Sequence, residues 1–154
     1  LHQARNHPTI ELLESLSAHI EEPGSILVWY APFETSRNTE MAKYAPTHAD
    51  FLYNLNDRII DLRDPFKHEV IVDPEFNGST SIKKILPALV ADSSYNDLDI
   101  QEGGSAARLW KEATINQTPD LDIQKTYSDL RAYCERDTLA MVLIHEKLEE
   151  LVKS

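Results

Sequence analysis

Two side chains towards the end of the chain, Tyr133 and Asp137, have the types and spacing that could do metal or acid–base chemistry. The apolar residues around them recur at helical intervals, as expected for one buried face: Leu130, Cys134, Met141, Ile144, Leu148 and Leu151. Asp137 falls within this series, so a helix that buries the series also carries a carboxylate towards the interior. Burying an unpaired ion costs several kcal/mol, so this carboxylate needs a cation, a cluster of donors or an opening to water. Tyr133 lies four residues earlier on the same side, where its hydroxyl can approach the carboxylate.

Asp137 also has a purely structural interpretation. It could lie at the edge of the core and pair with an Arg or Lys, or accept hydrogen bonds from a neighbouring helix end. Cys134 is the single cysteine, so an internal disulfide is excluded, and its place in the apolar series predicts a packing role.

The elements that must position these side chains alternate between strand and helix, which predicts an α/β layer with extra helices. Residues 26–30 and 58–62 are apolar runs that predict buried strands of a parallel sheet, and residues 68–72 predict an edge strand. Helical spacing with Pro, Ser, Thr or Gly starts predicts helices over residues 8–20, 32–45, 47–55, 81–89, 103–113 and from about 119 to the end. In the second of these, Phe33, Met41 and Tyr44 are expected on the inner face. We expect a single domain over residues 1–154.

Glu34 directly follows the first predicted strand, at the start of the next predicted helix. In open α/β sheets, ligands favour the crevice at the carboxyl ends of strands, so Glu34 is a candidate ligand. A single Glu in a first turn is otherwise a partner of the helix dipole. Ser79, Ser81 and Lys83 at another helix start could hold a phosphate, with helix capping as the alternative.

The composition restricts the possible partners. The 15 basic and 26 acidic side chains give a net charge of −11, so the chain as a whole does not attract nucleic acid. A local basic patch could still bind phosphate, because screening acts over about 10 Å. The chain contains no apolar run of about 18 residues, so no membrane span is predicted. The single cysteine is typical of a reducing, cytoplasmic compartment. The chain begins with Leu1 rather than Met, and we expect it to be the C-terminal part of a longer protein.

Four segments carry a resemblance to a known family: residues 28–34 (VWYAPFE), 58–62 (RIIDL), 79–83 (STSIK) and 133–137 (YCERD). In this order they resemble the DnaQ-like 3′→5′ exonucleases of the ribonuclease H-like fold, in the subgroup with tyrosine in the last motif. The chain is more similar still to an uncharacterised bacterial family of unknown function that has a DnaQ-like C-terminal domain. This resemblance covers most of the chain from about Ser25 onward.

The resemblance implies a helix-rich ribonuclease H-like fold that lacks its first strands, and two-metal hydrolysis of phosphodiester bonds at a single-stranded nucleic acid end. Two Mg²⁺ or Mn²⁺ ions would hold the scissile phosphate and activate a water, which requires several carboxylate ligands. On this resemblance, Glu34 is the acid of the second motif, Asp137 is the metal ligand of the last motif, and Tyr133 orients the attacking water.

The chain departs from the family pattern at three points. Tyr30 stands where the second motif commonly has Asn, Glu34 replaces the more usual Asp, and no Asp-x-Glu in an apolar strand precedes the first predicted helix. We therefore expect the remaining carboxylates upstream in the same protein. This chain alone is expected to bind metal weakly, if at all, and not to hydrolyse nucleic acid. Two rival interpretations stay open: a non-catalytic ribonuclease H-like interaction module, and an acidic helical scaffold unrelated to nucleases.

Overall fold

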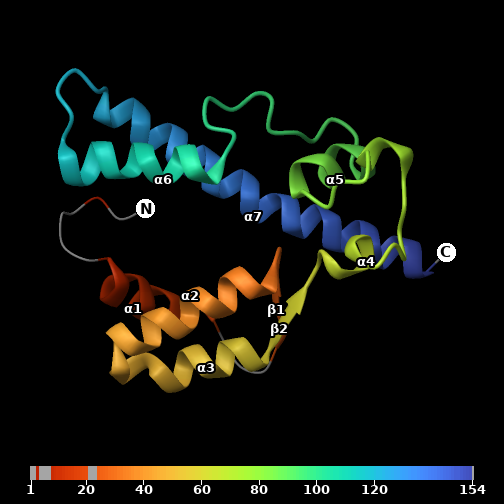
Figure 1. The fold of residues 1–154 in the computed structure, drawn as a ribbon, viewed down its shortest axis with the longest axis horizontal. Coiled ribbons are helices and arrows are strands. Elements are labelled where there is room, and N and C mark those ends of the chain that lie inside the picture. Colours follow the sequence, from red (N-terminus) through yellow and green to blue (C-terminus); the bar gives the residue numbers. More distant parts are fainter. Residues whose placement is uncertain (1–2, 4–7, 21–23, 154) are drawn as a thin grey trace. The chain divides into compact units, whose positions relative to one another are not determined.

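The computed structural model describes residue 3, residues 8–20 and residues 24–153. Helices dominate these residues and accompany one small two-stranded parallel sheet, which confirms the expected α/β class in a helix-rich form (Figure 1). The chain divides into two compact units, an N-terminal unit that ends at Val72 and a C-terminal unit that begins at Asp73. The single domain expected over residues 1–154 stays a prediction.

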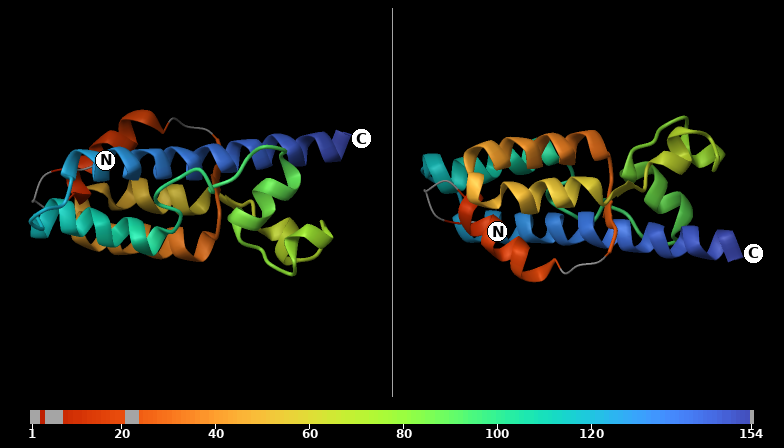
Figure 2. Two further views of the ribbon diagram at one scale, coloured as in Figure 1. Left: turned by 90° about the horizontal axis from the view of Figure 1, so that it is seen from above. Right: turned by 90° about the horizontal axis from the view of Figure 1, so that it is seen from below.

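The N-terminal unit combines a short parallel strand pair with helices. Its elements are α1 (Thr9–His19), β1 (Ile26–Val28), α2 (Ala31–Tyr44), the 3₁₀ turn η1 (Pro46–His48), α3 (Ala49–Asp57), β2 (Ile59–Asp61) and α4 (Asp64–Lys67). Val28 pairs with Asp61 at the carboxyl ends of the two parallel strands. Parallel strands need a long crossover connection, which α2 and α3 provide, lying side by side in both views of Figure 2.

A small apolar cluster holds the helices of this unit together. Leu13 of α1 packs with Ala42 and Ala45 at the end of α2 and with Leu52 of α3, all of them almost fully buried. Small alanine side chains at this point let the helices approach closely, and Leu52 fills the space between them.

Several expectations for this unit are wrong in detail. The strands are shorter than predicted, because the chain bends at Trp29 and Tyr30 after β1 and turns at Leu62 after β2. Most of their residues are half-buried rather than buried. Phe33 and Tyr44 are 54% and 56% exposed, so they do not form the inner face of α2. The predicted edge strand over residues 68–72 is instead a turn, because two successive backbone N–H groups there donate to the Pro65 carbonyl.

The C-terminal unit is built on one long helix. It contains the 3₁₀ turn η2 (Pro74–Phe76), α5 (Ile82–Leu89), α6 (Gly103–Lys111), the π-helical turn η3 (Glu112–Asn116) and α7 (Ile123–Lys153). Both α5 and α6 pack on α7, α6 beside its first half and α5 farther along (Figures 1 and 2). Ile85 and Leu86 of α5 are fully buried against it. The helices predicted around residues 81–89, 103–113 and the C-terminal end are therefore confirmed.

The buried face of α7 is close to the predicted one but rotated. Leu130, Tyr133, Ala140 and Ile144 are buried, and Asp137 falls on the same face between them. Cys134 is exposed, so its predicted packing role is wrong. Successive residues of a helix point about 100° apart, so a helix that buries Tyr133 turns its neighbour Cys134 away from the core. No helix among the described residues is long and apolar enough to cross a membrane.

Candidate functional site

The long helix α7 brings Tyr133 and Asp137 together, as their spacing predicts. Tyr133 is 8% exposed, while Asp137 is half-buried one turn later on the same face. A carboxylate in this position loses part of its hydration and needs hydrogen-bond donors from the protein.

A second tyrosine supplies one of these donors. The hydroxyl of Tyr95 donates to Oδ1 of Asp137 at 2.8 Å, and its ring lies 6.4 Å from the Tyr133 ring between centroids. Tyr95 is only 4% exposed. Sequence reasoning missed it, because it lies in the polar stretch between α5 and α6. The signal that could have found it is its place as the one aromatic residue in that acidic stretch.

Both tyrosine hydroxyls are held in the protonated form. Burial, followed by hydrogen bonding to the Asp137 carboxylate, raises the pKa of Tyr95 well above its ordinary value. The same two causes raise the pKa of Tyr133. Because a protonated phenol can donate where a phenolate cannot, Tyr95 keeps its hydrogen bond to Asp137 throughout the physiological pH range.

The segment that carries Tyr95 is fastened to α7 on either side. The Arg136 guanidinium binds both carboxylate oxygens of Asp97, at 3.0 and 2.8 Å, and donates to the Ser94 carbonyl. The ion-pair partner of Arg136 is therefore Asp97, and Asp137 forms no ion pair with any residue that the structure describes. The arginine pairing considered as a structural role for Asp137 is therefore not found in this part of the chain.

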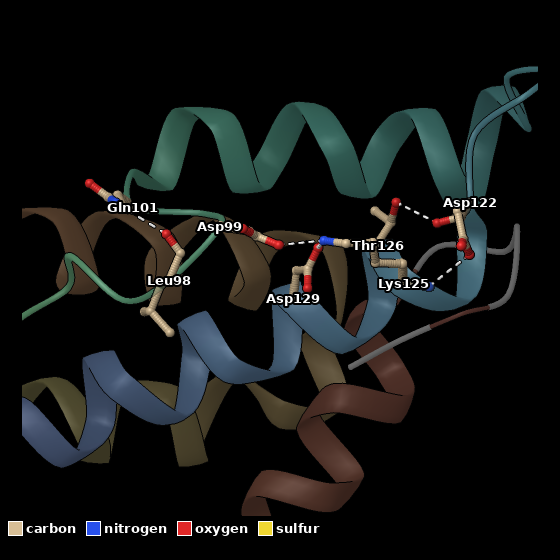
Figure 3. A network of polar contacts seen from close by, with 7 residues as sticks. All are labelled: Leu98, Asp99, Gln101, Asp122, Lys125, Thr126 and Asp129. Atoms are coloured by element: carbon tan, nitrogen blue, oxygen red, sulfur yellow. Dashed lines mark hydrogen bonds and ion pairs between the residues drawn. The ribbon is translucent and has the colours of Figure 1, made fainter.

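A second ionic contact between this segment and α7 lies near the start of the helix (Figure 3). The Lys125 ammonium bridges Asp99 of the connecting segment and Asp129 of α7, the latter at 2.7 Å. In the same turn, the Lys125 backbone N–H and the Thr126 hydroxyl donate to Asp122, at 2.9 and 2.8 Å. The bonds to Asp129 and then to Asp99 raise the pKa of Lys125. The segment that carries Tyr95 thus forms two ionic contacts with the same helix, through Asp97 and Asp99.

Lys83 of α5 lies over this pair of tyrosines. Its Nζ atom is 5.6 Å from the Tyr95 ring centroid and 5.9 Å from the Tyr133 ring centroid, within the range of cation–π attraction. Ser79 and Ser81, grouped with Lys83 as a possible phosphate site, instead form a local turn in which Ser79 Oγ accepts the Ser81 N–H at 3.2 Å.

Glu34 lies in the first turn of α2, beyond the carboxyl end of β1, where the sequence places it. The side chain is half-buried and forms no hydrogen bond or ion pair with the described residues. Burial raises the pKa of its carboxyl group. A half-buried carboxylate without a protein partner is a suitable ligand for a cation, because a cation would restore the interactions that burial removed.

Asp61, at the end of β2, fixes the junction between β1 and α2. Its carboxylate accepts the backbone N–H groups of Tyr30, Ala31 and Arg63 at 3.0, 2.8 and 3.0 Å. Burial alone would raise the pKa of this carboxyl group, but the three bonds and the nearby Arg63 charge lower it overall. Tyr30 has φ of 83°, a left-handed conformation in which Asn is more easily accommodated than Tyr. Asp61 was not predicted as a site residue; it lies within the strand predicted over residues 58–62, is the last residue of β2, and supports the turn that presents Glu34.

The three predicted site residues fall in different units. Tyr133 and Asp137 belong to the C-terminal unit and Glu34 to the N-terminal unit, so a pocket shared by the two acids stays a prediction. Within the described ranges, no three or more His, Cys, Asp or Glu residues are grouped to hold a metal ion.

Comparisons with known proteins give a family without an assigned activity. A family model described as a domain of unknown function, DUF2779, matches residues 1–81. Similar proteins include the uncharacterized protein UU173 of Ureaplasma parvum, 28% identical over 83% of this chain and 21% of its own length. The uncharacterized MG366 protein of Mycoplasma genitalium is 27% identical over 93% of this chain and 23% of its own length. The chain thus spans about a fifth of the length of these relatives. No solved structure matches it.

Proposed function

This chain belongs to the DUF2779 family of domains of unknown function, and we propose that it forms part of a metal-dependent 3′→5′ exonuclease with a DnaQ-like, ribonuclease H-like domain. The observation that carries the proposal is the arrangement around Asp137. A half-buried carboxylate on α7 accepts a hydrogen bond from the buried Tyr95, lies one helical turn from the buried Tyr133 and has no cationic partner among the described residues. This is the part of the chain with the most specific resemblance to the family's last motif.

In this proposal Asp137 is a metal ligand and Tyr133 orients the attacking water. Tyr95 is a positioning residue, since its hydroxyl fixes one oxygen of the Asp137 carboxylate. Glu34 provides a second carboxylate, and its lack of a partner in the described chain leaves both of its oxygens available to a cation. Bound Mg²⁺ or Mn²⁺ would polarise the scissile phosphate and lower the pKa of the attacking water.

The carboxylates of this chain do not make a complete two-metal site by themselves. A pair of divalent ions needs several oxygen ligands, and the described residues contain no such group. We propose that the upstream part of the same protein supplies the missing acids. The substrate is a single-stranded nucleic acid end and the compartment is the cytoplasm.

The test is nuclease activity of the full-length gene product on a 5′-labelled single-stranded oligonucleotide with Mg²⁺ or Mn²⁺. The proposal predicts stepwise shortening from the 3′ end, which a chelator stops. Asp137→Asn should lower the rate more than the about 10–100-fold typical for loss of a residue that only supports a metal ligand. Asp50→Asn, an exposed acid on α3, is the matched control and should leave the rate unchanged.

Two results would contradict the proposal. One is the absence of metal-dependent shortening by the full-length protein, which would favour the non-catalytic interaction module. The other is full activity of the Asp137→Asn variant. The 154-residue chain alone is expected to be inactive in the same assay, because its set of carboxylates is incomplete.

A further inference from the structure

The C-terminal unit contains a cavity of about 490 Å³ between α5 and the segment that carries Tyr95. This volume lies within the range of small-molecule sites, about 300–1,000 Å³. Its polar lining includes two lysines, two glutamates and two side-chain amides: Lys83, Lys84, Glu75, Glu102, Asn96 and Gln101. Tyr95 also contributes to the wall, which places the cavity beside the Asp137 cluster.

The four charged side chains at this cavity are not paired with one another. Neither lysine forms an ion pair with a described residue, and neither do Glu75 and Glu102, although all four line the same space. Elsewhere in this unit Lys125, Lys147 and Lys153 each bind a carboxylate. Charges of opposite sign that face one cavity without meeting leave both kinds of group available to a ligand.

Lys83 is also held in place without a carboxylate. Its ammonium group lies over the rings of Tyr95 and Tyr133, whose hydroxyls stay protonated because of burial and Asp137. The rings are therefore neutral, and they attract the ammonium group through their π faces without cancelling its charge. A positioned, uncancelled ammonium is a suitable group for binding a phosphate.

We propose that this cavity binds a nucleotide. The phosphate interacts with Lys83 and Lys84, and sugar hydroxyls donate to Glu75 or Glu102. The polar edge of the base meets the Asn96 amide and the amide oxygen of Gln101, whose nitrogen already donates to backbone carbonyls. A nucleotide fits the cavity chemistry because it carries one anionic group together with several hydrogen-bond donors and acceptors. This inference rests on the proposed function and deepens it, because the ligand in the full-length protein is the terminal nucleotide of the substrate strand.

The test is a calorimetric or NMR titration of the 154-residue chain with adenosine 5′-monophosphate, with chelator present so that metal plays no part. We expect saturable binding, and about tenfold or greater weakening for adenosine or inorganic phosphate alone, since each lacks half of the interactions. Lys83→Met and Lys84→Met should each weaken nucleotide binding about tenfold, the usual effect of losing one charged hydrogen bond. Lys111→Met, an exposed lysine on α6, is the matched control and should change affinity less than about twofold. Lys83→Arg keeps the charge and should retain binding, which separates a charge effect from a folding defect.

The inference is overturned if the nucleotide does not bind, if inorganic phosphate alone binds as tightly, or if Lys111→Met weakens binding as much as Lys84→Met. The outcome is separate from that of the nuclease assay. Nucleotide binding by a protein without nuclease activity would support the cavity assignment and refute the enzyme. If the full-length protein is an active nuclease but the 154-residue chain does not bind the nucleotide, the enzyme proposal is supported and the cavity assignment is refuted.

Discussion

The hydroxyl of Tyr95 should make a measurable contribution to stability through its bond to Asp137. Tyr95→Phe removes that hydroxyl and keeps the ring, so the packing against Tyr133 and the position beneath Lys83 are preserved. The lost interaction is a hydrogen bond of 2.8 Å to a carboxylate oxygen. Bonds to charged groups contribute about 1.5–3 kcal/mol. Asp137 is only half-buried, so water replaces part of the loss and we expect about 1.5 kcal/mol.

Urea denaturation of the chain measures this difference directly. Against a typical total of about 5–15 kcal/mol, a loss of this size shifts the midpoint clearly while the slope stays constant. Tyr53→Phe provides the control, since Tyr53 is 47% exposed and its variant should stay within about 0.5 kcal/mol of the parent. In an Asp137→Ala background, Tyr95→Phe should cost much less, because the acceptor is already absent.

An equal cost of Tyr95→Phe in both backgrounds would refute this reasoning. It would mean that the hydroxyl stabilises the fold through another group, and that Tyr95 does not position Asp137. A cost no larger than that of Tyr53→Phe would have the same meaning.

Three further predictions concern the ionisable groups. The pKa of Tyr95 and Tyr133 is raised, so their contribution to the unfolding free energy is complete below the ordinary pKa of 10.0 and is lost as pH rises beyond it. In a pH titration followed by phenolate absorbance, the absorbance of the Asp137→Asn variant should rise at lower pH than that of the parent. Glu34 has a pKa raised from 4.5, so its carboxylate destabilises the folded protein above that pH, where it is ionised, and not below it. Glu34→Gln should therefore stabilise the protein at neutral pH by a few tenths of a kcal/mol after solvent screening, with no gain at pH below about 4. Asp61 has a pKa lowered from 3.8, so its contribution to the unfolding free energy is present above that value and is lost as pH falls. Asp61→Ala should lower the unfolding free energy by about 2–3 kcal/mol in urea denaturation at neutral pH. An equal loss in strong acid would contradict this account.

The sequence predicted the helices well where local signals sufficed. Helical spacing of apolar residues, together with Pro and Gly at the boundaries, places α1, α5 and α7 close to their observed positions. The helix α2 contains polar residues that are weak helix formers, among them Thr35 and Thr39. In the structure, the Thr35 and Thr39 hydroxyls donate to carbonyls four residues earlier, at 2.9 and 2.7 Å, and Asp61 binds the backbone at its start. The last contact joins residues about thirty positions apart, so no local pattern could reveal it.

The candidate site shows the same division between local and distant information. Tyr133 and Asp137 could be paired from the sequence, because four residues of one helix bring them to the same face. Tyr95 is 42 positions from Asp137, in a stretch whose polar composition predicts only a turn. Its position depends on the contacts of Arg136 and Lys125 with that stretch, which the sequence does not encode locally. The exposure of Cys134 was missed because a one-residue rotation of the buried face leaves the apolar spacing almost unchanged.

The proposal that Asp137 is a metal ligand is tested most directly by Mn²⁺ titration calorimetry on the full-length protein. We expect Asp137→Asn to weaken Mn²⁺ binding, because the substitution removes the charge and one oxygen of a carboxylate ligand, and the exposed-acid control Asp50→Asn to leave the affinity unchanged. Unchanged affinity of the Asp137→Asn variant, or an equal loss in Asp50→Asn, would contradict the proposal.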